Sequence, residues 1–200
     1  MGGGTKAVMT LHDAAAVGDV AAMRRQVARG ANVDQRDANG SRPLHWASAA
    51  GKVESIRVLV ELKADTEATN AQGSTALHVA ARWGKVEATR VLVELKANTE
   101  ANAVDGYTPL HTAAKFGKVE VMRVLMQLNA NKDAKDAHGR TALHFAAGFA
   151  HVEAIKVLVL FGANKDAKGA DGATALHWAA KYGHAEAISV LIQLGADKNA

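Results

Sequence analysis

The chain has 200 residues, of which 48% are hydrophobic, 22% are charged and only 4% are aromatic, and it contains no cysteine. These values are typical of a globular protein, so they exclude disorder along the whole chain and a core built on large rings. The lack of cysteine excludes disulfides, thiolate zinc sites and cysteine nucleophiles, and it favours an intracellular location. The formal net charge of +4 is spread over both halves of the chain, with no basic arm or acidic tail.

The first ten residues are predicted to form a flexible leader. Three glycines follow Met1, and no apolar run here is long enough for a signal peptide. Lys6 stands where an N-myristoylation signal needs serine or threonine. Elsewhere the longest apolar stretches fall far short of the ~20 residues that span a bilayer. We therefore expect no membrane segment and a cytoplasmic or otherwise intracellular protein.

Residues 11–200 are organised by a strict period of 33 residues. Six leucine-histidine pairs carry this period, and their histidines are His12, His45, His78, His111, His144 and His177. Most glycines keep the same register, and the two prolines, Pro43 and Pro109, are two periods apart. A period without insertions indicates a repeat architecture. We expect a single domain of six repeats, at approximately 5–36, 37–69, 70–102, 103–135, 136–168 and 169–200.

Each period predicts two helices. In the segment Thr108-Pro109-Leu110-His111, the threonine hydroxyl can cap a helix amide and proline fits the first helical position. The glycine after this short helix turns the chain. A second helix follows, as in residues 53–62, where apolar residues cover more than one face and indicate packing between two neighbours. The connecting loop, for example residues 133–139, is polar and ends in a turn glycine.

With these motifs in phase, residues 11–200 resemble an ankyrin-repeat protein. The T-P-L-H motif is complete at Thr108 and takes the form T-A-L-H at Thr75, Thr141 and Thr174. The resemblance implies an all-α solenoid of six helix-turn-helix repeats, with protruding β-turn or hairpin loops on one side. It also implies a non-catalytic protein-protein interaction module, which binds its partner through the concave surface of short helices and loop tips.

The chain departs from the family pattern at several positions. Arg42 replaces the threonine cap of its repeat, and Ala150 replaces the usual glycine. Lys63, Lys96 and Asn129 stand where other repeats have glycine. If the backbone is left-handed there, lysine costs about 1 kcal/mol relative to glycine.

The repeated histidines do not predict catalysis or a metal site. Stacked repeats would place them about 10 Å apart, which is too far for two of them to bind one metal ion at about 2 Å. A histidine at every helix start is better explained as a hydrogen-bonding bracket between adjacent loops, which is also its role in the family. His138, His151 and His184 lie outside this pattern and are expected to be solvated. No motif of an enzyme, a cofactor site or a metal site is present, so we expect none of these.

Candidate partner-binding residues come from the positions that differ between repeats. In a repeat array the recurring positions build the core, and the varying positions are free to specialise. Aromatic residues and arginine are also enriched at binding hot spots. The resemblance places these positions on the concave face. The candidates are Trp46, Arg82, Trp83, Tyr107, Lys115, Phe116, Arg140, Phe145, Phe149, Trp178, Lys181 and Tyr182.

For the residue that follows each repeated histidine, the alternative is a place in the core. This alternative applies to Trp46, Phe145 and Trp178. The aromatic residues at the end of the short helix, such as Trp83, are expected to be exposed, because a core would be left with a void at Ala50 in the same frame. The candidates together are cationic and aromatic, which predicts an acidic, apolar segment of a protein as the partner.

Three other interpretations stay open. A nucleic acid is a rival partner, but the modest and evenly spread charge makes it the weaker one. The second is an engineered or designed scaffold without a natural ligand. The third concerns the ends of the stack, because Arg25 and Arg29 make the first repeat polar whereas the last repeat stays apolar. We expect a monomer, with end-to-end association through the last repeat as the alternative.

Overall fold

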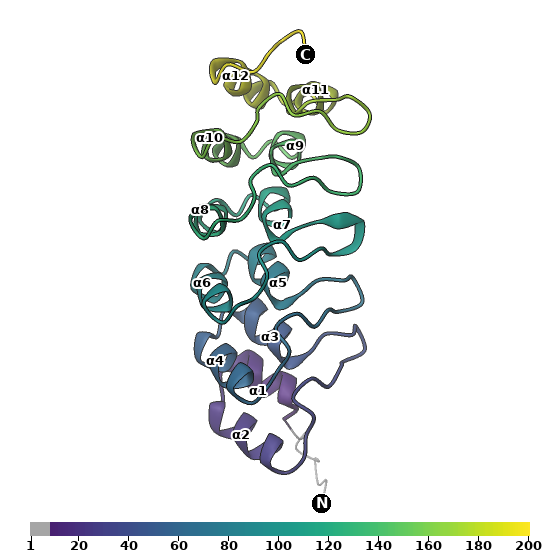
Figure 1. The fold of residues 1–200 in the computed structure, drawn as a ribbon. Helices are drawn as coiled ribbons and strands as arrows, with labels where there is room; N and C mark the ends of the chain where they lie inside the picture. Colours follow the sequence, from purple (N-terminus) through teal and green to yellow (C-terminus); the bar gives the residue numbers. More distant parts are fainter. Residues whose placement is uncertain (1–8) are drawn as a thin grey trace, which may run out of the picture.

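The computed structural model describes residues 9–200, so most of the predicted leader lies outside the described residues. This part of the chain forms a stack of six helix pairs (Figure 1), which confirms the expected all-α solenoid. The elements are α1 (Leu11–Val17), α2 (Val20–Ala28), α3 (Pro43–Ala50), α4 (Val53–Glu61), α5 (Ala76–Arg82), α6 (Val86–Glu94), the 3-10 turn η1 (Val104–Gly106), α7 (Pro109–Lys115), α8 (Val119–Gln127), α9 (Ala142–Gly148), α10 (Val152–Leu160), α11 (Ala175–Lys181) and α12 (Ala185–Gln193).

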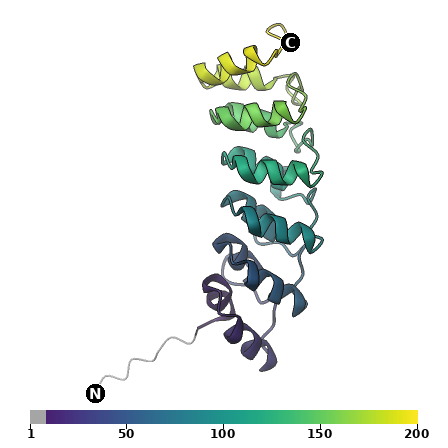
Figure 2. The ribbon, with the colours of Figure 1, turned by 90° about the vertical axis from the view of Figure 1, so that its left-hand side faces the viewer.

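The helices form two layers. The odd-numbered short helices make one layer, the even-numbered helices make the other, and the loops project from the side of the short helices (Figure 1). Figure 2 looks onto the even-numbered helices and shows them stacked one above another. Each loop after the first also donates a backbone amide to a carbonyl of the loop before it, as from Ala71 to the Asn39 carbonyl at 3.2 Å and from Ala137 to the Asp105 carbonyl at 2.8 Å. The loops therefore form a continuous ledge beside the short helices.

One apolar core runs through the whole stack. Leu77 of the repeated leucine-histidine pair is buried, and the small side chains of Ala80 and Ala81 let the short helices approach one another closely. Ile56 and Leu59 of α4 fill the space between the layers. Because α4 contacts α3 and both neighbouring even-numbered helices, its apolar residues must cover more than one face.

The starts of the short helices differ in one respect from the prediction. Thr10, one position after the frame of the predicted caps, caps α1, since its Oγ1 accepts a hydrogen bond from the Asp13 amide at 3.1 Å. In α5, however, the hydroxyl of Thr75 lies 2.9 Å from Nδ1 of His78, and the Thr75 amide donates to the same nitrogen at 3.3 Å. The same arrangement recurs at the starts of α9 and α11. In these three helices the imidazole takes the place that the helix amide was predicted to have. At the start of α7 the predicted cap is present, because Oγ1 of Thr108 accepts the His111 amide at 3.4 Å and also lies 2.9 Å from Nδ1 of His111.

The repeated histidines join consecutive loops, as predicted. Nε2 of His45 lies 2.9 Å from the carbonyl oxygen of Ser74, and Nε2 of His78 lies 2.7 Å from that of Tyr107. Equivalent bonds start from His12, His111 and His144. Because Nδ1 accepts the threonine amide hydrogen, Nε2 carries the proton and donates it to the next loop. Burial outweighs the bonds to backbone carbonyls and lowers the pKa of His78 to about 4, so this bracket is neutral at pH 7.

Two of the three other histidines are half-buried and hydrogen-bonded to the backbone, which the prediction of solvated side chains did not include. Nε2 of His151 lies 3.1 Å from the carbonyl oxygen of Lys115, and Nε2 of His184 lies 3.0 Å from that of Gly148. Each of these carbonyls belongs to the last turn of a short helix in the preceding repeat, where it has no partner within its own helix. His138 is exposed, as predicted.

The left-handed turns at the ends of the second helices are confirmed. Lys63, Lys96 and Asn129 have φ angles of 75°, 73° and 67°, in the region that favours glycine. Ala150 has a φ of 57°, so it also replaces glycine in a left-handed position.

Two further observations concern the described residues as a whole. No helix in residues 9–200 is both long and apolar enough to cross a membrane. The same residues contain no group of three or more histidine, aspartate or glutamate side chains placed to hold a metal ion.

Candidate partner-binding groove

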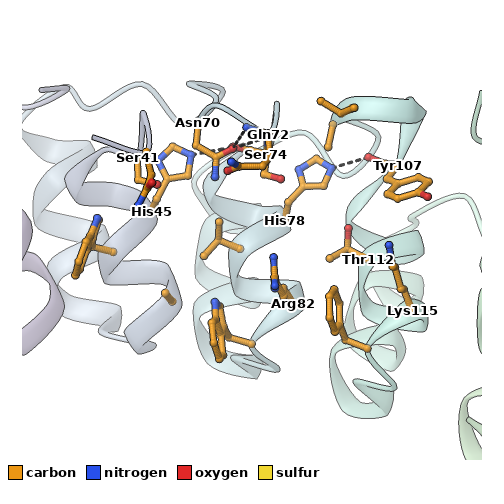
Figure 3. Close-up of a pocket in the computed structure, with 18 of the residues that line it drawn as sticks. Ser41, His45, Asn70, Gln72, Ser74, His78, Arg82, Tyr107, Thr112 and Lys115 are labelled. Carbon is orange, nitrogen blue, oxygen red and sulfur yellow. Dashed lines mark hydrogen bonds between the residues drawn. The ribbon is translucent and has the colours of Figure 1, made fainter. Parts of the chain in front are cut away.

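A groove of about 750 Å³ lies between the short helices and the loops of repeats two to four (Figure 3). Its helix wall comes from α3, α5 and α7. Its loop wall comes from the tips of the three loops that precede these helices. The groove brings together half of the predicted partner-binding residues, namely Trp46, Arg82, Trp83, Tyr107, Lys115 and Phe116.

Three of the four Trp, Tyr and Phe side chains that line the groove are exposed, and the fourth, Tyr107, is half-buried. Trp46 is 39% exposed, Trp83 is 58% exposed and Phe116 is 37% exposed. Trp83 and Phe116 directly follow α5 and α7, where the chain leaves the helix and turns away from the core. The expected exposure of these two residues is therefore confirmed. Trp46 is anchored at one edge, because its Nε1 donates a hydrogen bond to Oδ2 of Asp37 at 2.9 Å.

Two cations lie over aromatic rings in the groove. The guanidinium carbon of Arg82 is 4.8 Å from the centre of the Phe116 ring and 6.0 Å from that of Trp83. Nζ of Lys115 is 5.1 Å from the centre of the Tyr107 ring. Figure 3 shows Arg82 on α5, and Lys115 on α7 beside Tyr107. Among the ion pairs formed by residues 9–200, none involves Arg82 or Lys115, so both charges remain available to a ligand.

The loop wall carries carboxylates that the sequence analysis missed. Oδ1 of Asp37 accepts hydrogen bonds from the amides of Asn39 and Ser41, both at 2.8 Å. Burial raises the pKa of Asp37, but these bonds and the one from Trp46 outweigh it and hold the pKa below its ordinary value. Asp105 is exposed at the tip of the loop that precedes α7, and its φ is 62°. Its place before Gly106 in a tight turn was the signal available in the sequence.

Arg140 and Phe145 of repeat five and Trp178 of repeat six form a closed cluster, which packs against Tyr107 at the end of the groove. Phe145 is only 2% exposed, so its assignment to the partner-binding surface was wrong and the alternative of a core position was right. The guanidinium carbon of Arg140 lies 4.9 Å from the centre of its ring, and the ring of Tyr107 packs edge-on at 5.1 Å. Trp178 packs from the next repeat, with ring centres 6.3 Å apart.

A glycine and an ion pair explain why this cluster closes. A Cβ atom on Gly148 would lie 2.7 Å from the Trp178 ring, so only glycine lets the indole pack this closely. Nε of Arg140 donates to Oδ2 of Asp136 at 2.7 Å, and the Asp136 side chain is fully buried. Burial raises the pKa of Asp136, yet the bonds from Arg140 outweigh burial and keep the pKa below its ordinary value. Arg140 is thus already paired, unlike Arg82.

The last predicted residues, Phe149, Lys181 and Tyr182, are exposed but do not line the groove. Phe149 stacks on His151 and Tyr182 stacks on His184, with ring centres 6.3 and 6.1 Å apart. The structure therefore divides the predicted surface into an open groove, a closed cluster and exposed residues in the last two repeats.

Comparison with protein families agrees with this architecture. The family model described as "Ankyrin repeats (3 copies)" matches residues 11–105, 62–136, 94–169 and 129–200. A comparison with curated proteins gave no match. The family matches together span residues 11–200, and the chain belongs to the ankyrin-repeat family.

Proposed function

We propose that this protein is a non-catalytic binding module whose groove across repeats two to four holds an extended, apolar and acidic segment of a partner protein. Ankyrin repeats are generally protein-protein interaction modules. The observation that carries the proposal is that Arg82 and Lys115 lie over aromatic rings in an open groove and form no ion pair with any residue of 9–200.

The groove offers both components of a protein interface. Trp83 and Phe116 expose large apolar surfaces that a partner side chain can cover, and residues of this type dominate binding hot spots. A carboxylate placed beside Arg82 or Lys115 would form a charge-assisted hydrogen bond, which is about twice as strong as a neutral one. Because the walls are already formed, binding loses little conformational entropy on this side of the interface.

The charges of the groove are separated between its two walls. The cations lie on the helix side, whereas Asp37 and Asp105 lie on the loop side. An acidic side chain of the partner is therefore expected to point towards the short helices, and a hydrogen-bond donor towards the loops. A polyanion such as nucleic acid fits this arrangement less well, because its phosphates would also approach the two carboxylates.

A displayed library of random peptides tests the proposal without a known partner. Peptides selected on the folded protein should combine apolar residues with aspartate or glutamate. Binding of a selected peptide should weaken at least tenfold in Trp83→Ala and in Phe116→Ala, because each substitution removes an exposed aromatic hot spot. Phe149→Ala is the matched control, since it removes an aromatic residue that is 48% exposed but lies outside the groove.

The charge requirement has its own test. Arg82→Gln should weaken the binding of an acidic peptide more than it weakens the binding of the same peptide with glutamine in place of the acidic residue. The losses of binding free energy from the protein substitution and from the peptide substitution should therefore not be additive. Selection of peptides without acidic residues would contradict the charge assignment, and equal losses in Trp83→Ala and Phe149→Ala would contradict the site. A library that yields no binder would favour a scaffold without a ligand, and a steep salt dependence with oligonucleotides would favour nucleic acid.

A further inference from the structure

The floor of the groove is set by one frame of the repeat, the residue that follows each repeated histidine. Val79 and Thr112 hold this frame in repeats three and four, and both line the groove. Trp46 holds the same frame in repeat two, and the buried Phe145 holds it in repeat five. The smaller side chains of repeats three and four therefore leave space between two large ones.

Two exposed rings border this space at an interval of one repeat. Trp83 and Phe116 occupy the same frame and directly follow α5 and α7. The guanidinium carbon of Arg82 lies 6.0 Å from the centre of the Trp83 ring and 4.8 Å from that of the Phe116 ring. The two ring centres can be no farther apart than the sum of these distances, which agrees with one helix-packing step of about 10 Å.

This interval discriminates between the extended conformations of a bound chain. On one face of a β-strand, side chains recur every second residue, at about 7 Å and then at about 13 Å. A polyproline II helix has three residues per turn and rises 3.1 Å per residue, so residues three apart lie on the same face at about 9.3 Å. Of the two conformations, the polyproline II helix places like side chains at the interval of the two rings.

The indole of Trp83 adds a hydrogen-bond donor to the groove. Nε1 of Trp46 donates to Asp37, whereas Nε1 of Trp83 has no hydrogen-bond partner among residues 9–200, and Trp83 is 58% exposed. An α-helix also repeats one face at about 10.5 Å, every seven residues, but its carbonyl groups are already paired within the helix. A polyproline II helix has no internal hydrogen bonds, so its carbonyl groups are free to accept the Trp83 N–H.

We infer that the segment held in the groove is a polyproline II helix with two apolar residues, above all prolines, three positions apart and an acidic residue between them. The segment is the one of the proposed function, on which this inference rests, and its conformation and spacing are new. The apolar residues pack on Trp83 and Phe116, and the acidic residue meets Arg82, which lies near both rings. Proline-rich chains suit such a groove because they are extended before they bind and lose little entropy.

The row of rings continues past the groove, but the conditions for binding do not. Phe149 is the next member of the frame, yet it lies outside the groove and stacks on His151. Gly148 stands where Arg82 and Lys115 stand in their repeats. Two rings therefore hold the segment, and Phe149→Ala serves again as the control.

A displayed library of peptides with two fixed prolines tests the spacing. Three equal pools place the second proline two, three or four positions after the first, and all other positions are random. After selection on the full chain, the pool with the three-position spacing should be enriched at least tenfold over each of the others, with aspartate or glutamate enriched between the prolines. Equal enrichment of the three pools, or enrichment of another spacing, would overturn the inference.

Double-mutant cycles on a selected peptide assign each proline to one ring. Replacement of one proline with alanine should remove most of the loss of affinity caused by Trp83→Ala and preserve the loss caused by Phe116→Ala, and replacement of the other proline should do the reverse. Phe149→Ala should bind the peptide like the wild type. Coupling of both prolines to the same ring would contradict the match between the helical turn and the repeat.

The two proposals about the groove fail in different ways. If the fully random library yields acidic, apolar peptides that need Trp83 and Phe116, but no pool of the proline library is enriched, the polyproline II segment is refuted and the proposed function stands. Binders from both libraries that are insensitive to Trp83→Ala and Phe116→Ala would refute both proposals.

Discussion

The role of a side chain in this protein depends on what the neighbouring repeat places beside it. Phe145 is buried because Arg140 covers its ring and Trp178 packs against it. Trp83 is open because its position follows the short helix and faces away from the core. Both residues are aromatic members of variable frames; the sequence predicts exposure for Trp83 and leaves a core position open for Phe145. Gly148 explains the difference in burial between the two residues, because the lack of a side chain there lets Trp178 pack closely, and no other repeat has glycine at this position.

Backbone conformation gives the clearest prediction at this scale. Lys63→Gly should raise the free energy of unfolding by about 1 kcal/mol, because Lys63 has a φ of 75° and glycine adopts this conformation without the steric cost. Urea unfolding measures the change. The reciprocal variant Gly162→Lys, with a native φ of 79°, should lose a similar amount. A decrease in the stability of Lys63→Gly would be inconsistent with the left-handed turn.

The second helices are linked along the side of the stack by ion pairs that recur with the repeat. Arg24 pairs with Glu61 at 2.7 Å, and Arg57 pairs with Glu94 at 3.0 Å, so each arginine reaches the end of the next second helix. The following arginine, Arg90, is separated by the same number of residues from Gln127, and this position has no acid. The series of these pairs therefore ends at α6, because α8 has no carboxylate at the corresponding position.

Restoring that carboxylate is a test of the element-scale description. Gln127→Glu should add an ion pair with Arg90 and raise the free energy of unfolding by about 0.2–1 kcal/mol, the range of exposed pairs. The gain should disappear in 1 M salt. It should also disappear when the same change is made in an Arg90→Gln background, and a gain that survives there would point to another cause.

A row of buried histidines beside the ledge of loops links consecutive repeats along the molecule. His45, His78, His111 and His144 are buried, and burial lowers the pKa of each of them. A protonated ring would place a hydrogen on Nδ1, where the amide of the residue that caps the helix already donates. Protonation of these histidines would therefore break hydrogen bonds between several pairs of neighbouring repeats at the same pH.

Acid should destabilise the stack through these histidines. Between pH 6.5 and pH 4 these histidines bind more protons in the unfolded chain than in the folded chain. The free energy of unfolding therefore falls as the pH falls. His78, with a pKa of about 4, contributes a loss of about 3 kcal/mol over this range. Urea unfolding at pH 7.5 and pH 5 measures the slope, and His138→Gln, which changes an exposed histidine, should leave it unaltered. Equal stability at the two pH values would show that the brackets are not neutral.

Most of the fold could be predicted from the sequence, because the 33-residue period fixes which positions recur. The helix pairs, the histidine brackets and the left-handed lysines all depend on contacts that repeat. The division of the concave face could not be predicted, because it depends on one pair of residues, Arg140 and Asp136, and on the missing side chain of Gly148. Asp37 and Asp105 were missed because they were treated only as parts of turns.

The closed cluster of Phe145, Arg140 and Trp178 has a consequence for the register of a bound segment. A perfectly periodic groove would offer the same site again one repeat further along, and a ligand could bind in several frames with equal affinity. Here a segment that moved forward by one repeat would meet an arginine already paired with Asp136 and a phenylalanine with no exposed face. The cluster therefore breaks the translational symmetry of the array and blocks a shift of the bound segment towards the last repeat.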